Sequence, residues 1–184
     1  MVNVFEAAID VIKDWIDDEP KDPLHVGEVM GCWIYLGGLE EAASMVQAGL
    51  NTTTDGDLVH ALKQDQQLGE DQRKRLTDFM IREGISLPPA SETKPKSNPN
   101  DIPLGVKLTD DEIANGLSIK IASLIMNAAA GATQSIRNDV GLMFAQFQAE
   151  KMAFGASLKA LMRKRGWIKI PPYYYPPGRP GQSS

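Results

Sequence analysis

The stretch LTDFMIREGISLPP, from Leu76 to Pro89, decides the fold because the chain repeats its pattern near the C-terminus. The later stretch is LKALMRKRGWIKIPP, from Leu158 to Pro172, and the two align at an offset of 82 residues. In each stretch a long helical pattern ends at a glycine, Gly84 or Gly166, a residue that commonly terminates helices. The sequence therefore predicts an internal repeat of two helical hairpins of one design.

The first hairpin is expected over residues 22–84. Asp22 is the predicted N-cap, and Pro23 would occupy the first turn of the helix, where a proline costs no hydrogen bond. The stretch NTTTDGD, residues 51–57, is the predicted turn between the two helices. The first of these helices is apolar nearly all round, so we expect it to lie deep in a core.

The second hairpin is expected over residues 108–166. Thr109 and Glu112 have the spacing of a capping box, in which each side chain binds the other residue's backbone amide. The third long helix starts there, and the stretch RND, residues 137–139, is expected to bend the chain before the fourth helix. Between Glu112 and Arg137 the only charged residue is Lys120, which predicts an apolar bundle interior.

A proline-rich segment, residues 85–107, joins the hairpins and shows no helical or strand period. A segment of this length can run along a whole helix, and one long crossover between the second and third helices is the ferritin-like arrangement. Residues 1–20 have apolar side chains at helical spacing, which predicts an extra amphipathic helix. We therefore expect one all-α domain over residues 1–184, a ferritin-like four-helix bundle followed by a tail over 167–184.

Composition and charge exclude several function classes. The formal net charge is −5, so neutralising nucleic-acid phosphates is not an expected role. The acids lie early: residues 1–105 hold 19 acidic and 9 basic residues, against 5 and 10 afterwards. No membrane span is expected, because the most apolar stretch contains Lys120 and several Asn and Ser residues. Cys32, the single cysteine, is predicted to be a core residue.

Two motifs of the second hairpin carry a family resemblance. LTDDEIANGLSIKIASLIMNAA, residues 108–129, opens the hairpin, and MRKRGWIKIPPYYYP, residues 162–176, closes it. In these motifs the chain resembles the spore coat F family and its uncharacterised ferritin-like relatives from spore-forming bacilli. The resemblance implies a ferritin-like bundle linked to sporulation, located in the spore coat or the cytoplasm, with a structural role rather than an enzymatic one.

Metal chemistry in such bundles needs inward-facing carboxylates and two Glu-x-x-His pairs. The chain has only two histidines, which offer His25 with Glu28 and Asp57 with His60, each pair one helical turn apart. An acid and a histidine one turn apart also make ordinary hydrogen bonds at helix ends. We expect no bound metal, no cofactor and no catalytic residue, and these four residues are the candidates for a degenerate metal site.

The C-terminal tail is the candidate site for protein partners. Trp167, Tyr173, Tyr174 and Tyr175 are amphipathic aromatic residues, and proline pairs flank the tyrosines and preorganise an extended ligand. The partners expected are proteins, including other coat proteins, and the alanine-rich third helix could form a homodimer seam. The alternative functions are a metal-binding ferritin-like protein and a soluble stress or signalling module of the same fold.

Overall fold

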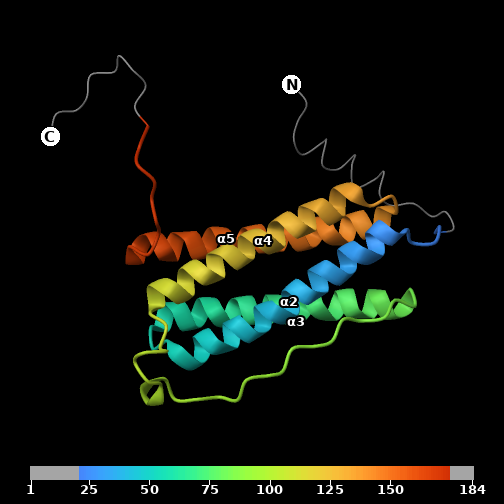
Figure 1. The fold of residues 1–184 in the computed structure, drawn as a ribbon. Coiled ribbons are helices and arrows are strands. Elements are labelled where there is room, and N and C mark those ends of the chain that lie inside the picture. Colours follow the sequence, from blue (N-terminus) through green and yellow to red (C-terminus); the bar gives the residue numbers. More distant parts are fainter. Residues whose placement is uncertain (1–20, 175–184) are drawn as a thin grey trace.

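The computed structural model describes residues 21–174, which form four long helices and a short 3-10 turn, with no strand in this range. The helices pair in two hairpins, α2 with α3 and α4 with α5 (Figure 1). The predicted all-α class is confirmed, whereas the helix predicted over residues 1–20 lies outside the described range. The bounds are α2 (Val26–Thr52), α3 (Gly56–Arg82), η1 (Pro99–Asp101), α4 (Asp110–Gln134) and α5 (Asn138–Arg165).

The two hairpins pack against each other through α2 on α4 and α3 on α5. α2 comes very close to its neighbours at two glycines. A Cβ on Gly38 would lie 3.1 Å from the Leu124 side chain, and one on Gly49 would lie 3.1 Å from Ile113 and 3.2 Å from Leu62. Larger side chains at these two positions would push α2 away from α4, so the glycines set the spacing between the hairpins.

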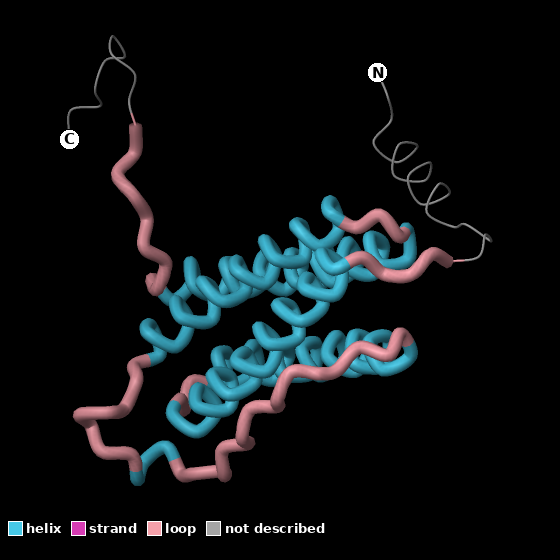
Figure 2. Tube along the Cα trace, turned by 45° about the vertical axis from the view of Figure 1, so that its right-hand side comes forward, coloured by secondary structure: helices cyan, strands magenta, loops and turns pink. Residues whose placement is uncertain are grey.

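The crossover between the hairpins runs along the whole length of the first one (Figures 1 and 2). Hydrogen bonds hold it against α2. Trp33 Nε1 donates to the Ser86 carbonyl oxygen at 2.7 Å, and Asn51 Nδ2 donates to the Pro95 carbonyl oxygen at 2.8 Å. The crossover therefore follows α2 in the same direction, and it brings the chain back to start α4 at the end of the bundle where α3 also begins.

The start of α2 differs from the prediction. The N-cap is His25 and not Asp22, and Pro23 lies before the helix instead of in its first turn. His25 Nδ1 accepts a hydrogen bond from the Gly27 amide at 3.0 Å, and Glu28 Oε2 accepts one from the His25 amide at 3.0 Å. This reciprocal capping box satisfies the free amides of the first turn, which Asp22 was expected to do.

The other helix ends follow the sequence signals. Thr109 and Glu112 form the predicted capping box of α4. Gly84 and Gly166 have φ of 73° and 72°, a backbone conformation in which a glycine avoids the strain of a Cβ atom. The matched amides after them, Ile85 and Trp167, donate back to the carbonyl oxygens of residues 80 and 162 at 2.8 and 2.9 Å. The two endings aligned in the sequence thus have one capping geometry, while the duplication itself stays a prediction.

The core consists of two clusters of buried side chains, one toward each end of the bundle. Around Tyr35, Phe144 and Phe147 the first cluster is aromatic, with the Tyr35 and Phe147 rings stacked at a centroid distance of 5.3 Å. Cys32 belongs to this cluster, which confirms its prediction as a core residue, and burial raises the pKa of its thiol to about 12. The second cluster is mainly aliphatic, with Phe154 as its buried aromatic residue, and includes Leu58.

Arg137 ties three segments together at the corner between α4 and α5. Its guanidinium makes hydrogen bonds to the carboxylates of Glu83, at 2.7 and 3.0 Å, and of Asp139, at 3.1 and 2.8 Å. It also donates to the Asp22 carbonyl oxygen at 3.3 Å, and Lys21 pairs with Asp139 at 2.8 Å. The segment before α2 is therefore fixed to the end of α3 and the start of α5.

Candidate functional site

The base of the C-terminal tail is anchored to the bundle. Trp167 and Ile168 are partly buried and pack against the aliphatic cluster. Asn115 Nδ2 donates to the Trp167 carbonyl oxygen at 2.9 Å, and Lys169 pairs with Asp111 at 2.6 Å. These contacts place the start of the tail over the first turns of α4, so Trp167 works at least in part as a structural anchor.

Beyond this anchor the tail leaves the bundle (Figure 1). Ile170 is 59 % exposed, and Tyr173 and Tyr174 are 75 % and 82 % exposed. Tyr175, the last of the predicted partner-binding residues, lies outside the described residues. Exposed aromatic side chains next to prolines offer rigid, amphipathic contact area, and Tyr173 and Tyr174 present such area at the surface of the described chain.

His25 and Glu28, one of the two candidate ligand pairs, act as helix caps. Glu28 is buried, and its Oε1 accepts hydrogen bonds from the Ile136 and Arg137 amides at 2.9 and 2.8 Å. Its Oε2 accepts from the His25 amide and lies 3.7 Å from His25 Nε2. One carboxylate thus satisfies three backbone amides, and it joins the start of α2 to the start of α5.

Asp57 and His60, the second candidate pair, lie at the other end of the bundle. Asp57 is exposed and pairs with Lys164 at 3.1 Å and Arg165 at 2.9 Å. The hydrogen bond from Lys164 is the largest cause that lowers the pKa of the Asp57 carboxyl. His60 is exposed as well. The four candidate ligands are therefore not brought together, and the described residues contain no group of three or more His, Cys, Asp or Glu side chains placed to hold a metal ion.

The bundle centre holds a buried ion pair that the sequence analysis missed. Lys151 on α5 and Asp65 on α3 are 0 % and 2 % exposed, and Lys151 Nζ donates to Asp65 Oδ1 at 2.8 Å. The expectation of an apolar interior was therefore wrong. A signal was present, because both residues continue the apolar heptad spacing of their helices, Asp65 after Leu58 and Leu62, and Lys151 after Phe144 and Phe147.

A second polar network lies next to this pair. Tyr35 Oη donates to Gln72 Oε1 at 2.9 Å, and Gln72 Nε2 donates to the Phe147 carbonyl oxygen at 3.2 Å and to Glu150 Oε2 at 2.7 Å. Arg75 also donates to Glu150 Oε2, at 2.6 Å. Burial, followed by the charge of Glu150, raises the pKa of Tyr35 above its usual range. The network connects α2, α3 and α5, and Arg75 Nε is its buried polar atom without a hydrogen-bond partner among the described residues.

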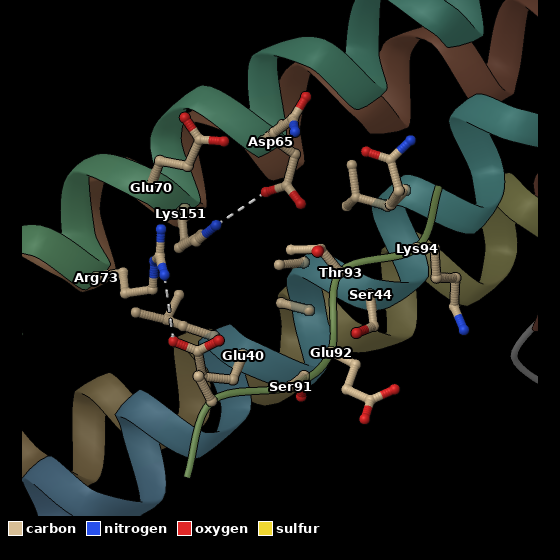
Figure 3. Close-up of a pocket in the computed structure, with 18 residues that line it drawn as sticks. Glu40, Ser44, Asp65, Glu70, Arg73, Ser91, Glu92, Thr93, Lys94 and Lys151 are labelled. Carbon is tan, nitrogen blue, oxygen red and sulfur yellow. Dashed lines mark hydrogen bonds and ion pairs between the residues drawn. The ribbon is translucent and has the colours of Figure 1, made fainter. Parts of the chain in front are cut away.

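A groove of about 250 Å³ opens above the buried ion pair, between α2, α3 and the crossover (Figure 3). Asp65 and Lys151 lie on its inner side, and residues 90–94 of the crossover form one wall. Glu40 and Arg73 pair across it at 3.6 Å. On the nearby helix α4, burial lowers the pKa of Lys120 to about 8. Two ion pairs, Asp65 with Lys151 and Glu40 with Arg73, thus neutralise four of the charged groups that line the groove.

α4 is the described helix that is long and apolar enough, by length and composition, to cross a membrane. Only 33 % of its most apolar window is buried inside the bundle. A core helix of a water-soluble protein meets the same criteria, so this single weakly apolar helix makes no clear membrane span. Its exposed apolar residues, among them Ile119 and Met126, instead form an uncovered surface of the described chain.

Comparison with known proteins places this geometry among proteins of bacilli. A curated relative, an uncharacterised protein named YvdQ from Bacillus subtilis (strain 168), is 32% identical over 160 residues, which cover 86% of this chain and 94% of the relative. A solved crystal structure, titled as that of a "putative spore coat protein" from Bacillus halodurans C-125, superposes with a TM-score of 0.81 at 33% identity. The match covers 84% of this chain and 97% of that one.

These matches support a relation to spore-forming bacilli, and the narrower resemblance to the spore coat F family stays a prediction. A family model matches residues 12–179, which span both hairpins, the crossover and most of the tail. The chain therefore belongs to the family described as "Protein of unknown function (DUF3231)".

Proposed function

We propose that this chain is a non-enzymatic structural protein of the spore coat, or one made for sporulation, that works by binding other proteins. The similar solved structure, that of a "putative spore coat protein" from Bacillus halodurans C-125, supports the cellular setting. The ion pair of Asp65 with Lys151, which neutralises two charges inside the bundle, supports a packing role. The proposed role requires neither a metal nor a cofactor.

The proposed fold is the ferritin-like arrangement, with two related hairpins and one long crossover. Two observations support it. The crossover follows α2 from Ser86 to Pro95, so α3 and α4 start at the same end of the bundle. The ends of α3 and α5 share the capping geometry of Gly84 and Gly166.

The tail carries the proposal for partner binding. Its base is fixed by Trp167 and by the pair of Lys169 with Asp111, while Tyr173 and Tyr174 extend into solvent. An anchored base reduces the freedom that the tip loses on binding, so the tyrosines start from a partly ordered state. The expected partner is a coat protein with an apolar cleft that accepts an extended, proline-flanked segment.

Fractionation of mature spores tests the proposal. The full-length chain, expressed from its own promoter, is expected in the coat extract, and a double variant, Tyr173→Ser with Tyr174→Ser, is expected to lose most of the coat-bound fraction at an unchanged melting temperature. Met152→Ser, at an exposed position on α5, is the matched control and should remain in the coat. Recovery of the unaltered protein in the cytosol of vegetative cells, or full coat retention of the tyrosine variant, would contradict the proposal.

A further inference from the structure

An uncovered apolar face extends over α2 and α4. It is defined here by six exposed side chains and is called the α2/α4 face. Between them the two helices form a groove of about 190 Å³, which is lined in part by Gly31, Gly131 and the ring of Phe144. The six side chains are Val26, Met30 and Ile34 on α2, Ile119 and Met126 on α4, and Ile136 directly after α4.

The α2/α4 face is almost free of charge. From Ile113 to Ile136 the only charged residue is Lys120, whose ammonium lies 3.5 Å from the Glu41 carbonyl oxygen on α2. On α2, the only charge between Val26 and Leu39 is Glu28, and backbone amides occupy its carboxylate. Contiguous apolar surface of this kind is uncommon on monomeric soluble proteins and marks a site that another element covers.

The chain itself contains a segment that could cover this face: residues 1–20, which carry an apolar stripe and come directly before Lys21. Lys21, the first described residue, is held at Asp139, and Arg137 binds the Asp22 carbonyl oxygen, next to Val26 and Ile136 at one end of the face. The twenty residues before it have an apolar stripe at helical spacing. The stripe consists of Phe5, Ala8, Ile9, Ile12, Trp15 and Ile16.

Residues 1–20 match the α2/α4 face in length and in charge. A helix over residues 3–19 would be about 25 Å long, and the stretch of α4 from Ile119 to Ile136 also spans about 25 Å at 1.5 Å per residue. Residues 1–20 hold six acids and one base, so their polar side is strongly acidic. The α2/α4 face has no free carboxylate to repel that segment, unlike the acid-rich outer surface of the first hairpin.

We propose that residues 1–20 fold as an amphipathic helix that lies in cis across the α2/α4 face of the same chain. Because the segment starts from Lys21, Trp15 and Ile16 lie nearest the groove at Gly31, and Phe5 lies nearest Ile119. The docked helix buries two apolar surfaces that otherwise both face water, and it prevents a second copy from using α4 as a homodimer seam. Docking in cis holds whether or not the protein belongs to a spore coat.

Paramagnetic relaxation in the full-length chain tests this placement. A nitroxide is attached to Asn3→Cys, since the native Cys32 is fully buried and its thiol pKa is about 12. With methyl-labelled Ile and Met, we expect the nitroxide to broaden Ile119 and Met126 several-fold relative to the reduced label. Ile81, an exposed residue on α3, should keep its intensity.

Two variants and a mixing experiment make the result decisive. Ile12→Asp should abolish the broadening at Met126, whereas Asp14→Ser, on the polar side of the segment, should retain it. The mixing experiment combines one chain that carries the nitroxide but no methyl label with a second chain that carries the methyl label but no nitroxide. Broadening in this mixture would show docking onto a second copy and overturn the proposal. Unbroadened Ile119 and Met126 signals in the spin-labelled chain would overturn it as well. So would light scattering that finds a dimer both for the intact chain and for the chain without residues 1–20.

Discussion

Breaking the ion pair between Asp65 and Lys151 is expected to destabilise the protein strongly, although the pair itself adds little net stability. Lys151 is 0 % exposed and Asp65 is 2 % exposed, so neither charge can turn to water when its partner is removed. Leaving one buried charge unpaired costs about 3–5 kcal/mol. For a chain of this length, a loss of about 3 kcal/mol lowers the melting temperature by roughly 6–12 °C.

A double-mutant cycle measures this effect. Lys151→Met and Asp65→Leu should each lower the free energy of unfolding by about 3 kcal/mol or more, because each leaves the other charge buried. The double variant should lie within about 1 kcal/mol of the original protein, since two apolar side chains of similar volume replace the pair. Urea unfolding followed by circular dichroism gives the four free energies, with the denaturant slope checked for two-state behaviour.

The single variants decide whether the reasoning holds. If Lys151→Met costs less than about 1 kcal/mol, Asp65 must be solvated through the groove or paired with another cation, and the pair does not isolate its charges as described. Lys120 is a candidate for that second cation, since the charge of Asp65 acts to raise the pKa of Lys120. Adding Lys120→Met to Lys151→Met would then restore a large cost and identify Lys120 as the substitute partner.

Three further perturbations address the helix ends. Glu28→Gln should lower the free energy of unfolding by about 2 kcal/mol in urea titrations, since hydrogen bonds to a charged group contribute about 1.5–3 kcal/mol each and the amide retains part of them; a neutral effect would contradict the capping role. The hydrogen bond from Arg137 lowers the pKa of Asp139 below its usual 3.8, so the ionised Asp139 carboxylate stabilises the fold fully above about pH 4, and this stabilisation is lost as the pH falls further. Asp139→Asn should therefore flatten the fall in melting temperature at acidic pH. An unchanged fall would refute this. Gly84→Ala, at φ 73°, should destabilise by roughly 1 kcal/mol, whereas Gly69→Ala, within α3 and without a neighbour in 4 Å, should stabilise by about 0.5–1 kcal/mol in the same assay; effects of equal sign would contradict the assigned backbone conformations.

The features predicted correctly depend on local chemistry. The capping box of Thr109 and Glu112 and the stop at Gly166 are set by residues within one turn, so the sequence pattern is sufficient to place them. The start of α2 was misplaced because two local signals competed: Asp22 followed by Pro23, and the capping box of His25 with Glu28. The same spacing that puts His25 and Glu28 on one side of a helix, as for metal ligands, is also the spacing of a capping box.

The features that were missed depend on the register between distant helices. Asp65 and Lys151 are 86 residues apart, and no local rule states that an acid on α3 and a lysine on α5 reach the same level of the bundle. The three amides that bind Glu28 likewise come from both sides of the fold, two of them more than 100 residues away. Such contacts follow from tertiary packing, which a single sequence does not specify.

The tight fit of α2 at Gly38 and Gly49 has a consequence for how the chain folds. Glycine inside a helix costs about 1 kcal/mol relative to alanine, so α2 has little helical tendency of its own. Two of the three side chains that pack against these glycines, Leu124 and Ile113, belong to the other hairpin, and the third, Leu62, belongs to α3. The first hairpin should thus be largely unstructured as an isolated peptide, and the two halves should melt in one cooperative transition although the sequence divides into two similar pieces.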